Sequence, residues 1–222
     1  MADLSPGDCE RIIIVGAGGF GREVLQWARH AWPDHVSKIA GFLSADPDKL
    51  AGHAPTLPIL GSPADFEPQP TDGLVLAIGV PGVRRQVAED LASKKGRFLT
   101  LAHPTAVVTS SSRIGPGSVL CPFSVVSDGV TIGRCVILNY HASVGHDCQV
   151  GDFGVLSPYA TIGGGARVSA DVFLGLHASV GPNVTVGPRG KISSNSCVLA
   201  STPADSLVYG VPGRIVRHIA VE

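Results

Sequence analysis

The sequence predicts two domains of different fold class: an α/β domain with a small parallel sheet, similar to half of a Rossmann fold, followed by an all-β parallel β-helix. A strand, a glycine-rich turn and a helix open the chain, and every sixth residue from Ile114 to Val198 is Ile, Leu or Val. The 28 glycines make the chain too turn-rich for a helix bundle, and its aromatic content of only 5% is too low for most β-sandwiches. We place the boundary at the His103-Pro104 dipeptide, so the domains cover residues 1–103 and 104–222.

The elements of the first domain follow from its apolar runs. Residues 11–15 form a short apolar strand, and GAGGFG at 16–21 separates it from a helix with one apolar face. That face consists of Val24, Leu25, Ala28 and Trp32. The other expected elements are strands over 39–43, 74–79 and 97–101 and a second helix over 83–95. Because strands and helices alternate, we expect the sheet to be parallel.

The second domain repeats a six-residue unit. Its aliphatic positions are Ile114, Leu120, Val126, Ile132, Leu138, Val144, Val150, Leu156, Ile162, Val168, Leu174, Val180, Val186, Ile192 and Val198. A glycine often directly follows the aliphatic residue. The residue four positions after the aliphatic residue is mostly small, as at Ser118 and Ala142. A chain that turns every six residues, with one branched side chain pointing inward per side, closes a triangular coil in about 18 residues. Stacked coils pair as parallel strands about 4.8 Å apart.

Charge and cysteine usage exclude several classes of function. The 17 basic and 18 acidic residues form no long run of either sign, so we expect neither a nucleic acid nor an acidic membrane surface as partner. The five cysteines include no CxxC pair, which argues against a disulfide framework or a thiolate zinc site. No apolar run approaches the roughly 18 residues of a membrane span, and no signal-type segment opens the chain. We therefore expect a soluble, cytoplasmic protein.

Several motifs together resemble those of the hexapeptide-repeat sugar O- and N-acyltransferases. This family includes sialic acid O-acetyltransferases and nucleotide-4-amino-sugar N-acetyltransferases. The motifs are GAGGFG at 16–21, AIG at 77–79, the hexads, His146-Asp147 and YGVPGRIVR at 209–217. The resemblance covers nearly the whole chain. It implies that the β-helix is left-handed, that acetyl-CoA is the co-substrate, that no metal is required and that the protein is a homotrimer.

The same resemblance implies an acyltransferase that acetylates an amine or hydroxyl of a nucleotide-linked amino sugar. In the family the residue at His146 is the general base, its acidic neighbour, here Asp147, orients the ring, and the backbone N–H at Gly164 holds the oxyanion. Gly164 lies one 18-residue coil beyond His146. Because consecutive strand residues point to opposite faces, His146 and Asp147 can cooperate only at a corner. The alternative is that Gly163, Gly164 and Gly165 merely relieve a tight turn.

The first domain is expected to bind the nucleotide, because backbone N–H groups and the helix dipole at a glycine turn face a phosphate. The expected contacts are Gly16, Gly18, Gly19, Phe20, Asp46, Gly79 and Arg84. The domain has room for one nucleotide-binding half, which favours a mononucleotide sugar over NAD. The alternatives are a glycine turn used for packing, a solvated turn aspartate and a surface arginine. Phe20 either stacks on the acceptor or packs against the helix behind it.

The acyl donor is assigned to the end of the chain. The resemblance gives YGVPGRIVR the role of closing the CoA groove, so the expected CoA contacts are Gly163, Gly165, Gly210, Pro212 and Arg214. The alternative is a turn that caps the last coil. Family members that acetylate UDP-linked amino sugars carry histidines where this chain has Phe20 and Val155. The identity of the acceptor therefore stays open.

Other functions compete with this interpretation. An O-acetyltransferase of a free sugar, a sialic acid or another small acceptor would use the same base. A γ-type carbonic anhydrase-like zinc enzyme would gather His141, His146 and His177 across a subunit boundary, although position 105, where that pattern has its lone histidine, is Thr105. A noncatalytic β-helix binding module would be insensitive to removal of His146.

Overall fold

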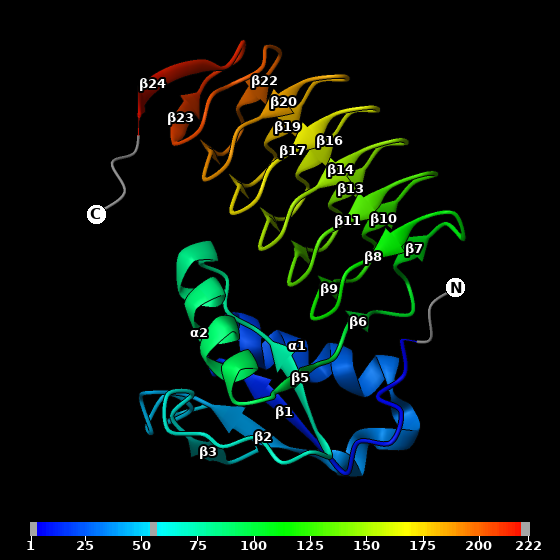
Figure 1. The fold of residues 1–222 in the computed structure, drawn as a ribbon, viewed down its shortest axis with the longest axis vertical. Coiled ribbons are helices and arrows are strands. Elements are labelled where there is room, and N and C mark those ends of the chain that lie inside the picture. The colour runs from blue at the N-terminus through cyan, green and yellow to red at the C-terminus, as the bar shows by residue number, and fades with distance from the viewer. Residues whose placement is uncertain (1–3, 54–56, 219–222) are drawn as a thin grey trace. The chain divides into compact units, whose positions relative to one another are not determined.

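The computed structural model of the chain describes residues 4–53 and 57–218. It divides into two compact units between Pro104 and Thr105. The first unit holds a five-stranded sheet of order β3-β2-β1-β4-β5 in which all neighbours are parallel (Figure 1). Its elements are β1 (Arg11–Val15), α1 (Gly19–Ala31), the 3-10 helix η1 (Pro33–Lys38), β2 (Ile39–Leu43), β3 (Ile59–Gly61), β4 (Asp72–Leu76), α2 (Pro81–Ser93), β5 (Arg97–Phe98) and β6 (Leu101–Ala102).

The central strand explains the apolar run near the start of the chain. Ile12, Ile13, Ile14 and Val15 are fully buried, and β1 pairs with β2 on one side and with β4 on the other, so it is a central strand of the sheet. From β1 the chain builds β2 and β3 on one side and then β4 and β5 on the other. The carboxyl ends of β1 and β4 therefore flank a topological switch point, where open α/β sheets bind their ligands.

The predicted elements of this unit are confirmed with shifted boundaries. The predicted strand over 74–79 is β4, which ends at Leu76 because its partner β1 ends at Val15. The predicted helix over 83–95 is α2, which begins at Pro81 because proline at the first turn needs no N–H partner. The predicted strand over 97–101 divides into β5 and β6.

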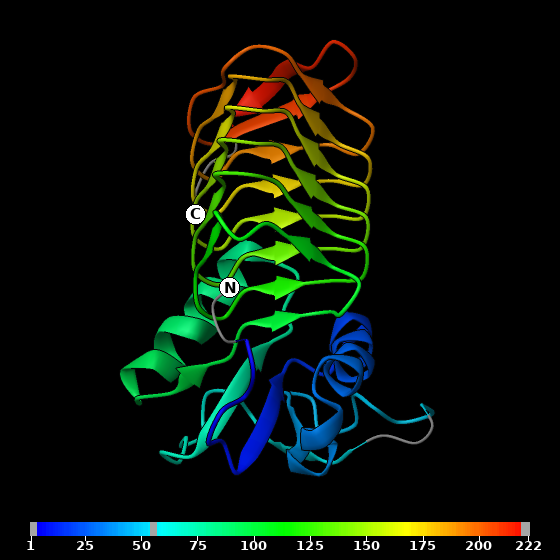
Figure 2. The same cartoon turned by 90° about the vertical axis from the view of Figure 1, so that its right-hand side faces the viewer.

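The second unit is a three-sided parallel β-solenoid, which confirms the fold class predicted from the hexads (Figure 2). Its strands are β7 (Val107–Val108), β8 (Arg113–Ile114), β9 (Val119–Leu120), β10 (Val125–Val126), β11 (Thr131–Ile132), β12 (Ile137–Leu138), β13 (Ser143–Val144), β14 (Gln149–Val150), β15 (Val155–Leu156), β16 (Thr161–Ile162), β17 (Arg167–Val168), β18 (Phe173–Leu174), β19 (Ser179–Val180), β20 (Thr185–Val186), β21 (Lys191–Ile192), β22 (Cys197–Val198), β23 (Ser206–Tyr209) and β24 (Arg214–His218).

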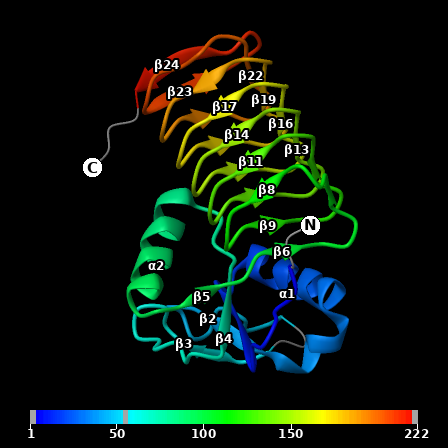
Figure 3. The ribbon, with the colours of Figure 1, turned by 45° about the vertical axis from the view of Figure 1, so that its right-hand side comes forward.

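Three faces make up this solenoid. Face 1 runs from β7 through β10, β13, β16 and β19 to β22, and face 2 runs from β8 through β11, β14 and β17 to β20 (Figure 3). Face 3 runs from β9 through β12, β15 and β18 to β21 and ends with β23 and β24. Each strand pairs with the strand one coil later, as Val126 pairs with Val144 and Val144 with Ile162. From Leu120 to Val198, the inward aliphatic residues are at most 3% exposed.

The corners between the faces contain residues with a left-handed backbone. Many of these residues carry side chains and are not glycine. Corner A, between faces 1 and 2, has Gly129, Asp147, Gly165 and Asn183 in this conformation; corner B has Cys135, Phe153, Asp171 and Arg189; and corner C has Phe123, His141, Tyr159, His177 and Asn195. Contacts between coils offset the steric cost of this conformation. At corner C the rings of Phe123, His141, Tyr159 and His177 stack with centroids 5.0, 4.7 and 4.7 Å apart.

Two further features describe the chain as a whole. Among the described residues, no helix is long and apolar enough to cross a membrane. All five cysteines are free thiols.

Candidate active site

A histidine and an aspartate meet at corner A. His146 and Asp147 occupy the turn between β13 and β14, and Asp147 has a φ of +60°. Nδ1 of His146 donates to Oδ2 of Asp147 at 2.8 Å. Because the pair sits at a corner and not within a strand, two consecutive residues can face each other. This geometry meets the condition that cooperation between them required.

Gly164 lies one coil beyond this pair and touches the imidazole. A Cβ atom at position 164 would lie 2.5 Å from Nε2 of His146 and 2.7 Å from its Cε1. The next residue ties the two coils together, since the N–H of Gly165 donates to the carbonyl of His146 at 2.8 Å. The missing side chain at Gly164 therefore leaves room for the imidazole itself.

This arrangement can take up a proton and hold a developing negative charge. With its Nδ1 proton directed at Asp147, the ring presents the lone pair of Nε2. The side chains of His146 and Asp147 are 71% and 73% exposed, so the pair lies at the protein surface. Within residues 4–53 and 57–218, the N–H of Gly164 donates to no protein acceptor, so it is available to an oxyanion.

Cys148 supports the glycine triplet from inside the solenoid. Its thiol donates to the carbonyl of Gly163 at 3.1 Å. Burial raises the pKa of the Cys148 thiol, with the nearby carboxylate of Asp147 as a smaller cause in the same direction. The thiol is thus kept protonated and acts as a donor rather than a nucleophile. Sequence reasoning missed this residue because its hexad position usually holds a structural small residue.

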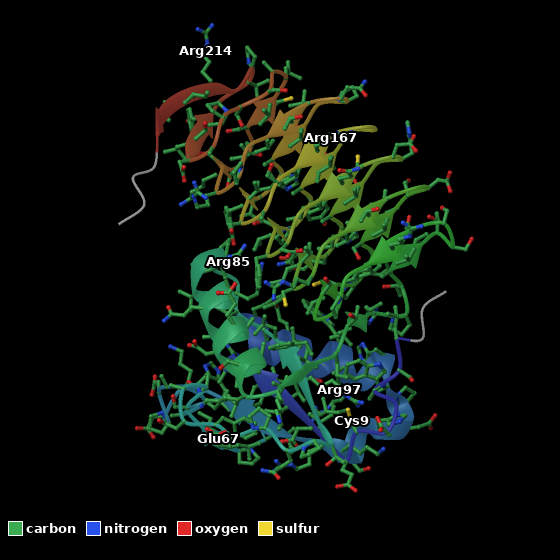
Figure 4. All side chains as sticks on the ribbon, in the orientation of Figure 1. Cys9, Glu67, Arg85, Arg97, Arg167 and Arg214 are labelled. Carbon is green, nitrogen blue, oxygen red and sulfur yellow. The ribbon has the colours of Figure 1, made fainter. Side chains whose placement is uncertain are left out.

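A shallow groove lies on face 2 next to corner A. Its volume is about 550 Å³, and it is lined by Thr131, Gly133, Gln149, Val150, Gly151, Arg167, Val168, Ser169 and Thr185. The lining strand β14 begins two residues after Asp147. Figure 4 labels Arg167 on this part of the solenoid. The groove thus runs along face 2 close to the His146–Asp147 turn, without including either residue in its lining.

The tail folds back onto the last coil. Strand β23 pairs in parallel with β21, and β24 returns antiparallel to β23. The N–H of Gly210 donates to Oγ of Ser196 at 2.9 Å, and the N–H of Gly213 donates to the carbonyl of Cys197 at 2.7 Å. Arg214 is exposed at the end of the solenoid (Figure 4). The tail therefore caps the last coil, which was the alternative considered for it, and leaves a cation at the surface.

The tail and the His146–Asp147 pair lie at different heights on the same solenoid. Ser143 pairs with Thr161, Thr161 with Ser179 and Ser179 with Cys197, so Cys197 is three coils beyond the strand that leads to His146. At about 4.8 Å per coil, this separation is roughly 14 Å along the axis. The structure does not bring Gly210, Pro212 and Arg214 up to His146, and only an extended ligand could contact both places.

The glycines of the first unit separate into two groups. A Cβ at Gly16 would lie 2.6 Å from the carbonyl oxygen of Ala77, and one at Gly21 would lie 2.0 Å from that of Gly16. These two glycines are needed for packing. A Cβ at Gly18 or Gly79 would meet nothing within 4 Å, and one at Gly19 would meet only the guanidinium of Arg22 at 3.9 Å. Packing therefore does not explain these three, which leave the backbone open to a ligand at the switch point.

The side chains predicted around this turn have partners inside the protein. Phe20 packs edge-on against Trp27, with centroids 5.8 Å apart. Oδ1 of Asp46 accepts from the N–H of Asp48 at 3.0 Å, as in a simple turn. The possibility of a surface arginine at position 84 is wrong, because Arg84 is fully buried and donates to the carbonyl of Ile78 at 2.9 Å.

One pair beside the turn was not expected from the sequence. Nη1 of Arg22, in the first turn of α1, lies 3.2 Å from Nδ1 of His53. Nothing in the sequence pattern links these two residues, which are 31 positions apart.

The histidines of the zinc alternative do not converge within one chain. The rings of His141 and His177 belong to corner C and stack on opposite sides of Tyr159, whereas His146 belongs to corner A. Over the described part of the chain, no group of three His, Cys, Asp or Glu side chains is placed to hold a metal ion.

Comparison with known proteins links both units to one family. A family model described as the PglD N-terminal domain matches residues 11–91. GDP-perosamine N-acetyltransferase of Escherichia coli O157:H7 is 28% identical over 138 residues, which are 61% of this chain and 62% of that protein. UDP-N-acetylbacillosamine N-acetyltransferase of Bacillus subtilis (strain 168) is 46% identical over 46 residues, 21% of each chain. The chain thus matches less than two thirds of the length of either relative.

Solved structures match more of the chain. PerB from Caulobacter crescentus, in complex with CoA and GDP-perosamine, has a TM-score of 0.83 at 28% identity and covers 92% of this chain and 96% of that one. The acetyltransferase domain of PglB from Neisseria gonorrhoeae, in complex with acetyl coenzyme A, has a TM-score of 0.82 at 26% identity and covers 94% of this chain and 100% of that one. Both units are therefore present in these structures.

Proposed function

Because this chain belongs to the hexapeptide-repeat sugar acyltransferase family, we propose that it transfers an acetyl group from acetyl-CoA to the amine of a nucleotide-linked amino sugar. The observation that carries the proposal is the His146–Asp147 pair at corner A, in contact with Gly164. Two relatives are named for N-acetylation of a GDP-linked and a UDP-linked sugar, which favours a nucleoside diphosphate sugar as the acceptor.

In the reaction, the acceptor amine attacks the thioester carbonyl and a C–N bond forms. Nε2 of His146 takes the proton that the nitrogen loses, and Asp147 stabilises the imidazolium through its bond to Nδ1. The N–H of Gly164 stabilises the oxyanion of the tetrahedral intermediate. When the intermediate collapses, the C–S bond breaks and the imidazolium returns its proton to the leaving thiolate. The products are the amide and free CoA.

The nucleotide lies at the switch point of the first unit. Gly18, Gly19 and Gly79 let a diphosphate approach the backbone and the N-terminus of α1. Gly16 and Arg84 act by shaping this turn, since one packs against Ala77 and the other holds the carbonyl of Ile78. Phe20 and Asp46 line its rim. These roles are supported by the topology and by the open space at the three glycines.

Acetyl-CoA extends from corner A toward the tail. Gly163 and Gly165 border the thioester, and the groove on face 2 receives the pantetheine arm. Gly210 and Pro212 shape the tail, and Arg214 contacts a CoA phosphate. The support is the separation of roughly 14 Å between corner and tail, a span suited to an extended arm. We also propose that the protein is a cytoplasmic homotrimer; its five free thiols suit a reducing compartment.

The test of this function is the replacement His146→Ala. Release of CoA thiol is measured with acetyl-CoA and a panel of UDP-, GDP- and dTDP-linked amino sugars. We expect turnover to fall by about 100-fold or more, because the general base is removed. His141→Ala, at corner C, is the matched control and should keep turnover. Unchanged turnover in His146→Ala would refute the proposal, and no effect of any panel member on thermal stability would remove the nucleotide sugar from it.

A further inference from the structure

We infer that Gly129, one coil before the catalytic corner, positions the carboxylate of Asp147 and, through it, the imidazole of His146. The inference rests on the proposed function, because it takes His146 as the base. Gly129 contacts no reacting atom, so it is a positioning residue. The evidence is the place that each oxygen of Asp147 occupies.

The two carboxylate oxygens of Asp147 face different neighbours. Oδ2 accepts from Nδ1 of His146 at 2.8 Å. Oδ1 lies over Gly129, where an added Cβ would come within 2.9 Å of it, closer than Cβ contacts in proteins normally are. The carboxylate can hold its bond to the imidazole only while position 129 has no side chain.

Backbone conformation alone does not explain this glycine. Gly129 has a φ of +66°, and Phe123, Cys135 and His141 adopt similar values of 60°, 54° and 59° at neighbouring corners. The solenoid thus accepts side chains at such positions. What distinguishes position 129 is the carboxylate of Asp147 that rests on it.

The same arrangement recurs two coils later at corner A. A Cβ at Gly165 would lie 2.4 Å from Oδ1 of Asn183. Corner A therefore alternates a glycine with an Asp or Asn whose side chain folds back over the preceding coil. At corner C, by contrast, the residues one coil apart are aromatic and stack. Because of this alternation, the side chain of Asp147 lies against a glycine, Gly129, and not against another side chain.

Gly129 is itself held in place. Its N–H donates to Oγ of Ser111 at 3.1 Å, and the hydroxyl of Ser111 donates to the carboxylate of Asp128. The N–H of Asp147 donates to the carbonyl of Asp128 at 2.9 Å. Ser111, Asp128 and Gly129 thus form a fixed shelf under Asp147. The catalytic pair lies between this shelf and Gly164.

The test is Gly129→Asn, because Asn183 and Asn195 adopt φ values of 59° and 56° in the same solenoid. The atom that would meet the new side chain is the movable end of Asp147, so the carboxylate should shift while the coil stays folded. We expect kcat to fall by about 10- to 100-fold. The KM values for acetyl-CoA and for the acceptor, and the Tm, should change little. Gly7→Asn, at a glycine with φ +60° and open space around it, is the control for backbone strain and should keep kcat.

A double-mutant cycle shows whether Gly129 acts through Asp147. In an Asp147→Ala background, Gly129→Asn should change kcat by less than about twofold, since no carboxylate remains to be displaced. An equal loss of kcat in both backgrounds, or full activity of Gly129→Asn alone, would overturn the inference.

The ¹⁵N chemical shifts of the His146 ring give a readout that does not depend on turnover. In Gly129→Asn they should move toward those of Asp147→Ala, and unchanged shifts would overturn the inference. Should His146→Ala keep its activity, the proposed function fails while these shifts still decide the role of Gly129.

Discussion

A single absent carbon at Gly164 determines where the imidazole of His146 can lie. The atoms nearest to an added Cβ are Nε2, Cε1 and Cδ2 of the ring, at 2.5, 2.7 and 3.0 Å. A methyl group would therefore displace a side chain and leave the backbone in place. The consequence falls on proton transfer and not on folding.

For Gly164→Ala we predict a fall in kcat of about 100-fold, with Tm close to wild type, because the base is moved from the reacting nitrogen. Steady-state kinetics and thermal unfolding check both parts. Gly181→Ala is the control, since a Cβ there meets its nearest neighbour at 3.3 Å and lies away from the ring. Wild-type kcat in Gly164→Ala would show that the contact between position 164 and the His146 ring does not matter for turnover.

Single residues differ in how far the sequence reveals them. The contact between His146 and Gly164 could be predicted, because the hexads fix a coil of 18 residues and any two residues that far apart share a column. The contact between Asp147 and Gly129 obeys the same arithmetic, but the direction in which Asp147 points follows from its left-handed backbone and its rotamer. The burial of Arg84 was also hidden, since a charged side chain gives no periodic signal of being inside.

Among the elements, α1 contacts the residue that follows β6 through two histidines. Nδ1 of His30 lies 3.0 Å from Nε2 of His103. Burial lowers the pKa of His103 below its ordinary value of 6.5, and the charge of His30 adds to the effect. Because the folded state holds its proton less tightly than the unfolded chain, this histidine favours folding above pH 6.5, and the contribution is lost as the pH falls through the folded pKa.

We therefore predict that Tm falls between pH 7.5 and pH 5, and that His103→Asn makes this decline shallower. His30→Asn should have a smaller effect of the same sign, since it removes only the second cause. Thermal unfolding followed by circular dichroism across this range is the measurement. A His103→Asn protein whose Tm falls as steeply as wild type would show that this histidine does not set the slope.

Element boundaries followed the sequence wherever burial is continuous. Strand β1 was predicted to the residue because it is an apolar run in the centre of the sheet. Strand β3 was missed because it is a three-residue edge strand with partly exposed side chains. The 3-10 helix η1 was missed because none of its residues is buried, so it has no apolar periodicity. An element that packs against only one neighbour buries few side chains, so its sequence has no clear apolar pattern.

At the scale of the whole molecule, the site includes a groove that stays open along one solenoid face. We propose that an adjacent chain of a homotrimer closes this groove to form the CoA cleft. The sequence predicts this assembly only through that resemblance, because the inward hexad residues that carry the period are buried inside one chain.

We predict that light scattering gives three times the mass of one chain and that dilution lowers specific activity as the chains dissociate. Acetyl-CoA should oppose this dissociation if it binds between chains. A monomer that keeps full activity at every concentration would rule out a shared site.

The strict pairing of each strand with the one 18 residues later limits how this protein can change length. Six residues gained or lost between Gly129 and Gly164 would carry every later residue onto the next side of the prism, and the base would lose one of its two glycines. Eighteen residues added beyond Gly165 would leave both glycines beside the pair and would only lengthen the solenoid between corner A and Arg214, the residue that we propose contacts a CoA phosphate. An insertion of one whole coil of 18 residues is therefore the smallest change in length that keeps the proposed site intact.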